Sequence, residues 1–135
     1  MFDQFSYLYV EDDPLSREIM DVVMKSIMMV KSFVMFENSA NFMARLEALP
    51  QPPDFILLDI HIEPHSGFDL LDMIRANGAY ANASIVALTA SVMNQEVEQL
   101  KHSGFDGAIA KPVDVRVFPD LMRQIINGES VWYIA

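Results

Sequence analysis

The sequence contains no cysteine, few basic residues and no long apolar run. The lack of cysteine excludes disulfide frameworks and thiolate metal sites, and it fits a reducing compartment, so we expect a cytoplasmic protein. Nine Lys and Arg against 19 Asp and Glu give a net charge of −10. This argues against a nucleic-acid surface, which needs basic side chains to neutralise phosphates. A membrane span would need about 18 uninterrupted apolar residues, and the first residues lack the basic start of a secretory signal.

The chain of 135 residues is 52% hydrophobic, which fits one domain with a single sizeable core. Gly128 follows the last predicted helix, so we place the folded domain at residues 1–128. Residues 129–135 are then a C-terminal tail or the start of a linker. The tail is rich in apolar side chains, and a mobile apolar end invites association. We therefore expect it to pack on its own domain, to bind a second copy in a homodimer, or to lead into a missing output domain.

Short apolar runs alternate with segments of helical periodicity, and this alternation indicates a parallel sheet with helices on both faces. We predict a doubly wound α/β fold with five strands in the order 2-1-3-4-5, the flavodoxin-like arrangement. The predicted strands are Phe5–Val10, Phe33–Phe36, Phe55–Asp59, Ile85–Thr89 and Ala108–Ala110.

Two helices carry specific expectations. Asp13-Pro14 should open the first helix, because Asp is favoured at the cap and Pro at the first helical position. Its apolar stripe is predicted from residues at helical spacing, namely Leu15, Ile19, Val22, Val23 and Ile27. The last helix should begin late or bend, because Pro119 lacks the N–H of a fifth helical residue after the cap candidate Asp114.

The stretch Phe55-Ile-Leu-Leu-Asp59 is the strongest pointer to function. Four consecutive apolar residues preceded by two prolines predict a strand buried on both faces, with Asp59 at its carboxyl end. Ligand sites in open α/β sheets form at the carboxyl ends of the strands. The predicted order places the ends of the first and third strands side by side, so Glu11 and Asp12 should lie next to Asp59.

Neighbouring carboxylates repel by about 4 kcal/mol per pair at 4 Å and an effective dielectric near 20, so a cation is expected among them. Hard oxygen ligands without cysteine favour Mg²⁺, Mn²⁺ or Ca²⁺, and Mg²⁺ typically joins a few carboxylates to waters and a phosphoryl oxygen. The fourth strand should bring the Thr89 hydroxyl to this edge, and the fifth the Lys111 ammonium. These groups indicate a phosphoryl-transfer site in which Asp59 can serve as the nucleophile.

The same residues stand at characteristic intervals. Gly67 follows Asp59 by eight residues, Thr89-Ala90 follows it by thirty, and Lys111-Pro112 follows Thr89 by twenty-two. Together with the acid pair Glu11-Asp12, this series resembles the receiver domain of two-component response regulators of the chemotaxis-regulator kind. The resemblance covers about residues 5 to 127.

The resemblance implies that Asp59 is the phosphoacceptor, taking a phosphoryl group from a histidine kinase or a histidine phosphotransfer protein. Mg²⁺ or Mn²⁺ would be held by Glu11, Asp12, Asp59 and the backbone carbonyl of His61. The phosphorylated domain would then switch a face that binds a downstream protein or an output domain. Such a domain is not a turnover enzyme, and its activity is limited to self-phosphorylation from a phosphodonor and slow loss of the phosphate.

The resemblance also assigns roles around the phosphoryl group. Thr89 would be the switch hydroxyl and Lys111 the partner of the phosphate, while His61 and Ser91 would flank the path of the hydrolytic water. Two positions depart from the usual receiver pattern. Ala108 stands where most receivers have an aromatic, so we expect switching mainly through Thr89 and the loop into the fourth helix. Proline comes five residues after the acceptor, at Pro64, rather than four.

Two other functions are compatible with parts of this pattern. A phosphatase with an aspartyl nucleophile would use the same acid and metal, but it usually has a second Asp two residues later, where this chain has His61. A receiver-like interaction module that works without phosphorylation would need neither the acceptor nor its partners. The presence of Asp59, Thr89 and Lys111 together favours the phosphoacceptor.

Overall fold

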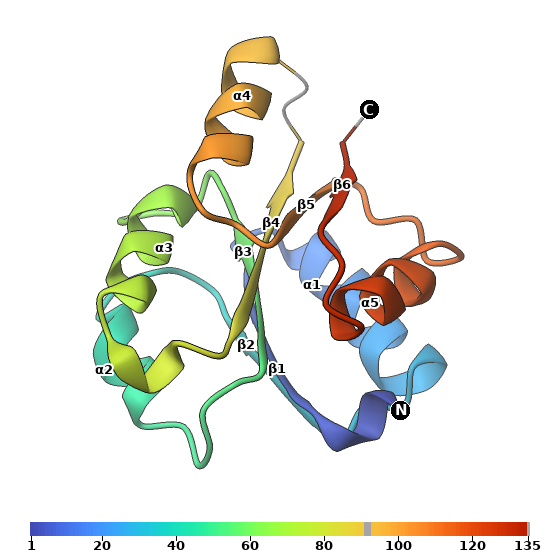
Figure 1. Ribbon diagram of the computed structural model, residues 1–135. Helices are drawn as coiled ribbons and strands as arrows, with labels where there is room; N and C mark the ends of the chain where they lie inside the picture. Colours follow the sequence, from blue (N-terminus) through green and yellow to red (C-terminus); the bar gives the residue numbers. More distant parts are fainter. Residues whose placement is uncertain (91–92, 135) are drawn as a thin grey trace.

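A computed structural model describes residues 1–90 and 93–134 and contains one parallel sheet (Figure 1). The strand order is β2-β1-β3-β4-β5-β6, so the predicted order of the first five is confirmed and a sixth strand is added at the edge. The strands are β1 (Ser6–Val10), β2 (Ser32–Phe36), β3 (Phe55–Asp59), β4 (Ser84–Thr89), β5 (Gly107–Ala110) and β6 (Val131–Tyr133).

Helices cover both faces of the sheet, with α1 and α5 on one side and α2, α3 and α4 on the other (Figure 1). The α-helices are α1 (Pro14–Val22), α2 (Phe42–Glu47), α3 (Gly67–Arg75), α4 (Asn94–His102) and α5 (Phe118–Ile126). A π-helical segment, η2 (Val23–Ile27), continues α1, and short 3-10 turns form η1 (Phe2–Gln4) and η3 (Gly78–Tyr80). In the described part of the chain, no helix has the length and apolar character needed to cross a membrane.

The sheet separates two apolar clusters because side chains alternate along each strand. Ile56 and Leu58 of β3 pack toward α2, α3 and α4, whereas Phe55 and Leu57 pack toward α1 and α5. Every residue of β3 is buried, as its unbroken apolar run predicts. Burial of each such side chain contributes about 1.5–3 kcal/mol, so β3 and the acid at its end are held firmly in the apolar interior of the domain.

The predicted apolar stripe of α1 is largely wrong. Leu15, Val22 and Ile27 are exposed, and the side chains that face the sheet are Met20, Val23, Met24 and Met28. Two apolar stripes compete on this helix, and unbranched methionine fills the irregular space against the sheet readily. The change to π-helix at Val23 also shifts the phase of the helical repeat.

The C-terminal part follows two other predictions. Asp114 accepts hydrogen bonds through its backbone carbonyl from Val117 and Phe118, and α5 begins only at Phe118 with Pro119 in its first turn. The predicted late start is thus confirmed. Packing of the tail is also confirmed, because β6 pairs in parallel with β5 and both Val131 and Ile134 are buried.

Candidate functional site

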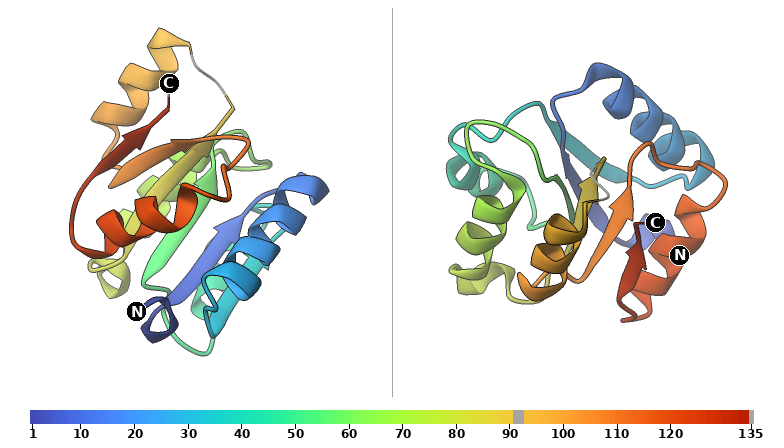
Figure 2. Two further views of the ribbon diagram at one scale, coloured as in Figure 1. Left: turned by 90° about the vertical axis from the view of Figure 1, so that its right-hand side faces the viewer. Right: turned by 90° about the horizontal axis from the view of Figure 1, so that it is seen from above.

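The strands β1, β3, β4 and β5 are neighbours and parallel, so their carboxyl ends lie at the same end of the sheet (Figure 2). Asp59 is the last residue of β3, and Glu11 and Asp12 directly follow β1. Each of these three acids offers a carboxylate oxygen, and the three oxygens lie within 4.8 Å of one another. The predicted convergence of Glu11, Asp12 and Asp59 is therefore found in the structure.

Glu11 is fully buried and is the best-connected acid of the site. Its Oε1 pairs with Lys111 Nζ at 2.7 Å and accepts a 2.7 Å hydrogen bond from the Tyr9 hydroxyl. Burial by itself would raise the pKa of Glu11, but the hydrogen bonds from Lys111 and Tyr9 outweigh it and lower the pKa. Glu11 is held as a carboxylate, and it fixes the ammonium of Lys111 over the site.

Asp59 lies in an environment that disfavours its charged form. It is 4% exposed, and burial together with the hydrogen bond and negative charge of Glu11 raises its pKa to about 6. Lys111 Nζ lies 3.6 Å from Oδ1 and works in the opposite direction. The backbone N–H of His61 donates to the same oxygen at 3.3 Å. A buried carboxylate with incomplete charge compensation gains from any further positive group at this edge.

Lys111 follows β5 and joins the two buried acids. Burial favours the neutral amine, but the hydrogen bond to Glu11 and the charges of Asp59 and Glu11 outweigh it, so the pKa of Lys111 is raised. It is therefore a permanent cation at neutral pH. Lys111 neutralises only part of the charge of the three neighbouring carboxylates, and the remaining charge with its cluster of hard oxygen donors fits a divalent cation such as Mg²⁺.

Thr89, at the end of β4, has a partner that sequence reasoning missed. Its hydroxyl donates to Glu96 Oε1 at 3.0 Å, and His61 Nε2 lies 3.1 Å from the same oxygen. Glu96 belongs to the first turn of α4. The acid two residues into a predicted helix gave no spatial signal, because only the fold brings α4 over the end of β4.

Two further residues support the acid pair. Arg17, on α1, donates from Nη1 to the backbone carbonyls of Glu11 and Asp12 at 3.0 and 2.8 Å. Tyr9 of β1 lies two residues before Glu11, and this period-2 spacing, which places side chains on one face of extended chain, could have indicated their contact from the sequence. Asp13 caps α1 by accepting from the backbone N–H of Ser16, as predicted.

Gly67 brings the start of α3 against the end of β3. A Cβ at this position would lie 2.8 Å from the Asp59 carbonyl oxygen and 2.9 Å from Ile60 Cα, closer than real side chains approach. Ser66 and Asp69 form a capping box at the same helix start. The carbonyl of His61 as a metal ligand stays a prediction, and Ser91 lies outside the described residues.

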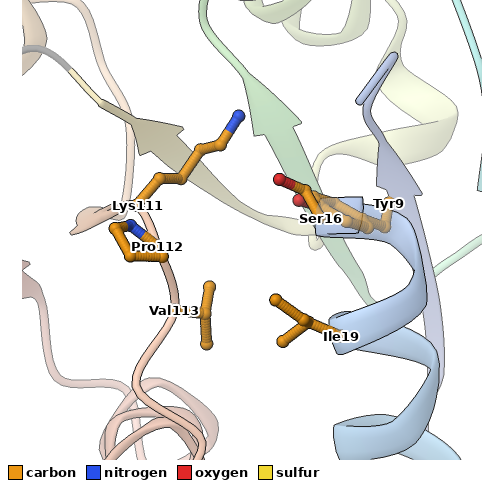
Figure 3. Close-up of a pocket in the computed structure, with 6 residues that line it drawn as sticks. All are labelled: Tyr9, Ser16, Ile19, Lys111, Pro112 and Val113. Atoms are coloured by element: carbon orange, nitrogen blue, oxygen red, sulfur yellow. The ribbon is translucent and has the colours of Figure 1, made fainter. Parts of the chain in front are cut away.

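A small pocket lies beside the acids, between α1 and the segment that follows β5 (Figure 3). Figure 3 shows Ile19 and Val113 opposite one another across it, with the Lys111 side chain on the side of Pro112 and Val113 and extending toward Ser16 and Tyr9. The lining residues are Tyr9, Ser16, Ile19, Lys111, Pro112 and Val113. The pocket thus shares Lys111 with the acid site and has apolar side chains on two sides.

Known proteins with sequences like this one are response regulators. The chain is 28% identical to a nitrate/nitrite response regulator protein homolog of Haemophilus influenzae, covering 97% of this chain and 61% of that protein. It is 22% identical to the polar-differentiation response regulator DivK of Brucella ovis, covering 90% of this chain and 96% of DivK. The chain therefore spans less than two thirds of the first relative and nearly all of the second.

Solved structures support the fold. The signal receiver domain of a DNA-binding response regulator from Colwellia psychrerythraea superposes with a TM-score of 0.79 at 20% identity, covering 91% of this chain and 98% of that one. The receiver domain of a sensor histidine kinase from Pseudomonas aeruginosa, with a magnesium ion in its active-site cleft, gives 0.78 at 22% identity with the same coverage. The family model of the response regulator receiver domain matches residues 7–123, and the chain accordingly belongs to the receiver domains of two-component response regulators.

Proposed function

We propose that Asp59 accepts a phosphoryl group from a histidine kinase or a histidine phosphotransfer protein in a Mg²⁺-dependent reaction. The observation that carries this proposal is the placement of the buried Asp59 carboxylate. It lies beside Lys111, the two other acids and the end of β4, where Thr89 stands. A carboxylate oxygen of Asp59 would form the new P–O bond. The P–N bond of the donor phosphohistidine would break, and its electron pair would return to the imidazole nitrogen.

The residues of the site would have different roles in this transfer. Glu11, Asp12 and Asp59, with the His61 carbonyl, would hold Mg²⁺ or Mn²⁺, which neutralises phosphoryl charge and orients the phosphorus when bound. Lys111 already lies 3.6 Å from Asp59 Oδ1 and would contact an equatorial phosphoryl oxygen. No second acid follows Asp59 at the position taken by His61, so we propose slow loss of the acyl phosphate rather than turnover of an external substrate.

An exposed apolar groove next to the site is a suitable docking face for the donor protein. Leu15 is 63% exposed, and Val22 and Val115 are also exposed. Ile19 lines both this groove and the pocket that contains Lys111. A protein that docks here would bring its phosphohistidine to the acids, with α1 and the segment before α5 as walls. The groove is lined by Leu15, Glu18, Ile19, Val22 and Val115.

The proposal also covers the location of the protein, the bounds of the domain and its output. A cytoplasmic location agrees with the absence of cysteine. We propose residues 1–128 as the receiver domain itself, to whose sheet the tail adds β6. Its output would be a downstream protein or an output domain, and homodimer formation through the tail stays a prediction.

The test is the intact mass of the protein after incubation with acetyl phosphate, with and without Mg²⁺. The proposal predicts a gain of one phosphoryl group that requires Mg²⁺ and is absent in Asp59→Asn. Asp72→Asn, a matched change at an exposed position of α3, should label like the wild type. Lys111→Gln should label more slowly. Absence of label in the wild type under all metal conditions would contradict the proposal.

A further inference from the structure

We infer that Glu96 is a positioning residue that links the Thr89 hydroxyl, through α4, to the docking of the C-terminal strand β6. The inference rests on the proposed function, because the event that Glu96 would transmit is the phosphorylation of Asp59. Three observations support it: the contacts of Glu96, the packing of α4, and the close fit of β6 on β5.

The first observation is that one oxygen atom joins both sides of the site. Glu96 Oε1 lies 3.0 Å from Thr89 Oγ1 and 3.1 Å from His61 Nε2. The Glu96 side chain is 19% exposed and its contact with Thr89 is partly buried, whereas the His61 side chain is 63% exposed. His61 stands two residues after Asp59. The first turn of α4 is therefore tied to the ends of both β3 and β4.

The second observation concerns the inner face of α4. Leu100 is fully buried and Val97 is half-buried, and both belong to the apolar cluster that contains Ala108, Phe105 and Ile134. Trp132 of β6 packs against the same cluster. The inner face of α4 and the ring of Trp132 thus pack into one apolar cluster on the same face of the sheet.

The third observation is the close approach of β6 to β5, which lie side by side in Figure 2. Trp132 lies opposite Ala108, which in turn lies opposite Ala87 of β4, so two small side chains stand beside the ring in one row of the sheet. A Cβ on Gly107 would lie 2.5 Å from the Val131 carbonyl oxygen. Only glycine allows this approach, and β6 has just three residues to hold it there.

The chemistry of threonine explains how the link would change state. A hydroxyl has a single proton to donate, so Thr89 cannot donate to Glu96 and to a phosphoryl oxygen at Asp59 at the same time. Phosphorylation supplies a competing acceptor, and its negative charge also repels the Glu96 carboxylate. Release of the first turn of α4 then loosens the packing of Trp132. Phosphorylation can shift the equilibrium only through a contact that differs between the two states. Here that contact is the hydrogen bond between Thr89 and Glu96.

Trp132 is the sole tryptophan of the chain, so its fluorescence and its quenching by acrylamide report on β6 directly. In unlabelled full-length protein, Glu96→Ala should increase the quenching, and Glu96→Gln, which keeps an acceptor for Thr89, should largely restore the wild-type value. Glu98→Ala removes the same charge from an exposed position of α4 and should leave quenching unchanged. Equal quenching in wild type, Glu96→Ala and Glu98→Ala would overturn the inference, whether or not Asp59 can be labelled.

The second arm compares labelled with unlabelled protein, using acetyl phosphate and Mg²⁺ and measuring mass and quenching on the same sample. Labelling should shift Trp132 emission to longer wavelength and increase quenching in the wild type, but not in Glu96→Ala. Gly107→Ala should show strong quenching in both states, because the added methyl group displaces Val131. Wild-type protein that gains the phosphoryl mass without a change in Trp132 would overturn the link and leave the proposed function standing, whereas a missing mass gain would contradict the proposed function alone.

Discussion

The segments that follow β3 and β4 border the same acids but are held in different ways. After β3, Gly67 packs its backbone on Asp59 and Ile60, Ser66 caps α3, and Ser39 both donates to the His65 carbonyl and accepts from its N–H at 2.7 Å. After β4, Glu96 of α4 accepts a hydrogen bond from the Thr89 hydroxyl and lies 3.1 Å from His61 Nε2.

The difference separates two tasks. The acceptor Asp59 needs a fixed position for in-line transfer, and small misplacements of a reacting group are costly. The hydroxyl of Thr89 needs two positions, and the Glu96 carboxylate to which it donates is partly exposed, so a phosphoryl group could replace it. Substitutions after β3 should therefore cost stability, whereas substitution of Glu96 should mainly change communication with β6.

The largest expected effect is that of Gly67→Ala. The added Cβ would meet the Asp59 carbonyl oxygen and Ile60 Cα at less than 3 Å, and overpacking against backbone costs about 3 kcal/mol. Urea denaturation should show this loss of unfolding free energy, together with slower labelling of Asp59. Gly78→Ala is the matched control, because a Cβ there has no atom within 4 Å among the described residues. Equal stabilities of the two variants would contradict a rigidly packed segment after β3.

Asp59→Asn should have the next largest effect and should raise stability in metal-free buffer. The pKa of Asp59 is about 6 in the folded state against 3.8 as its ordinary value. A raised pKa in an acid destabilises the folded protein as pH rises through this interval. The variant's advantage should grow between about pH 4 and pH 6 and then stay constant, reaching about 3 kcal/mol at pH 7. Thermal unfolding across this pH range measures it, with Asp72→Asn as control. An advantage that shrinks with rising pH would contradict the electrostatic account of the site.

Ser39→Ala tests the side-chain anchor of the same segment. The variant leaves the His65 N–H and carbonyl without the two hydrogen bonds of the hydroxyl, at a cost of about 1–2 kcal/mol. Urea denaturation should detect the loss, while Ser26→Ala, at an exposed position, should fall within about 0.5 kcal/mol of the wild type. A neutral Ser39→Ala would mean that Gly67 and the capping box alone hold this segment.

Glu96→Ala should have the smallest effect on stability, below about 1 kcal/mol, because a partly exposed carboxylate contributes little to folding. Glu98→Ala again serves as the control, and the same urea series measures both. A loss of unfolding free energy for Glu96→Ala as large as that for Gly67→Ala would show that the segments after β3 and β4 are held equally firmly.

The sequence predicted those parts of the site that depend on topology. Once β1, β3, β4 and β5 were recognised, the meeting of Glu11, Asp12, Asp59 and Lys111 followed, because parallel strands end at one edge. Contacts that depend on the direction of single side chains could not be read in this way, and Glu96 and Arg17 were missed. The wrong stripe on α1 has the same origin, since two apolar faces compete there and only packing against Tyr7 and Tyr9 selects between them.

The edge strand β6 shows another limit. The apolar character of residues 131–135 predicted packing, but a strand of three residues carries too short a pattern to reveal its pairing. Its place depends on Gly107, whose missing side chain leaves room for the Val131 carbonyl. A glycine within a strand can indicate a close backbone approach, but Gly107 lies just before the predicted fifth strand and is the first residue of β5.

The most direct test of the account is the position of the phosphoryl group in labelled protein. Fragmentation of the chain after incubation with acetyl phosphate and Mg²⁺ would assign the added mass to a single residue. The account predicts that it resides on Asp59, as an acyl phosphate that forms only with Mg²⁺ and disappears in Asp59→Asn. A phosphoryl group on His61, on His65 or on an acid outside the cluster would contradict it.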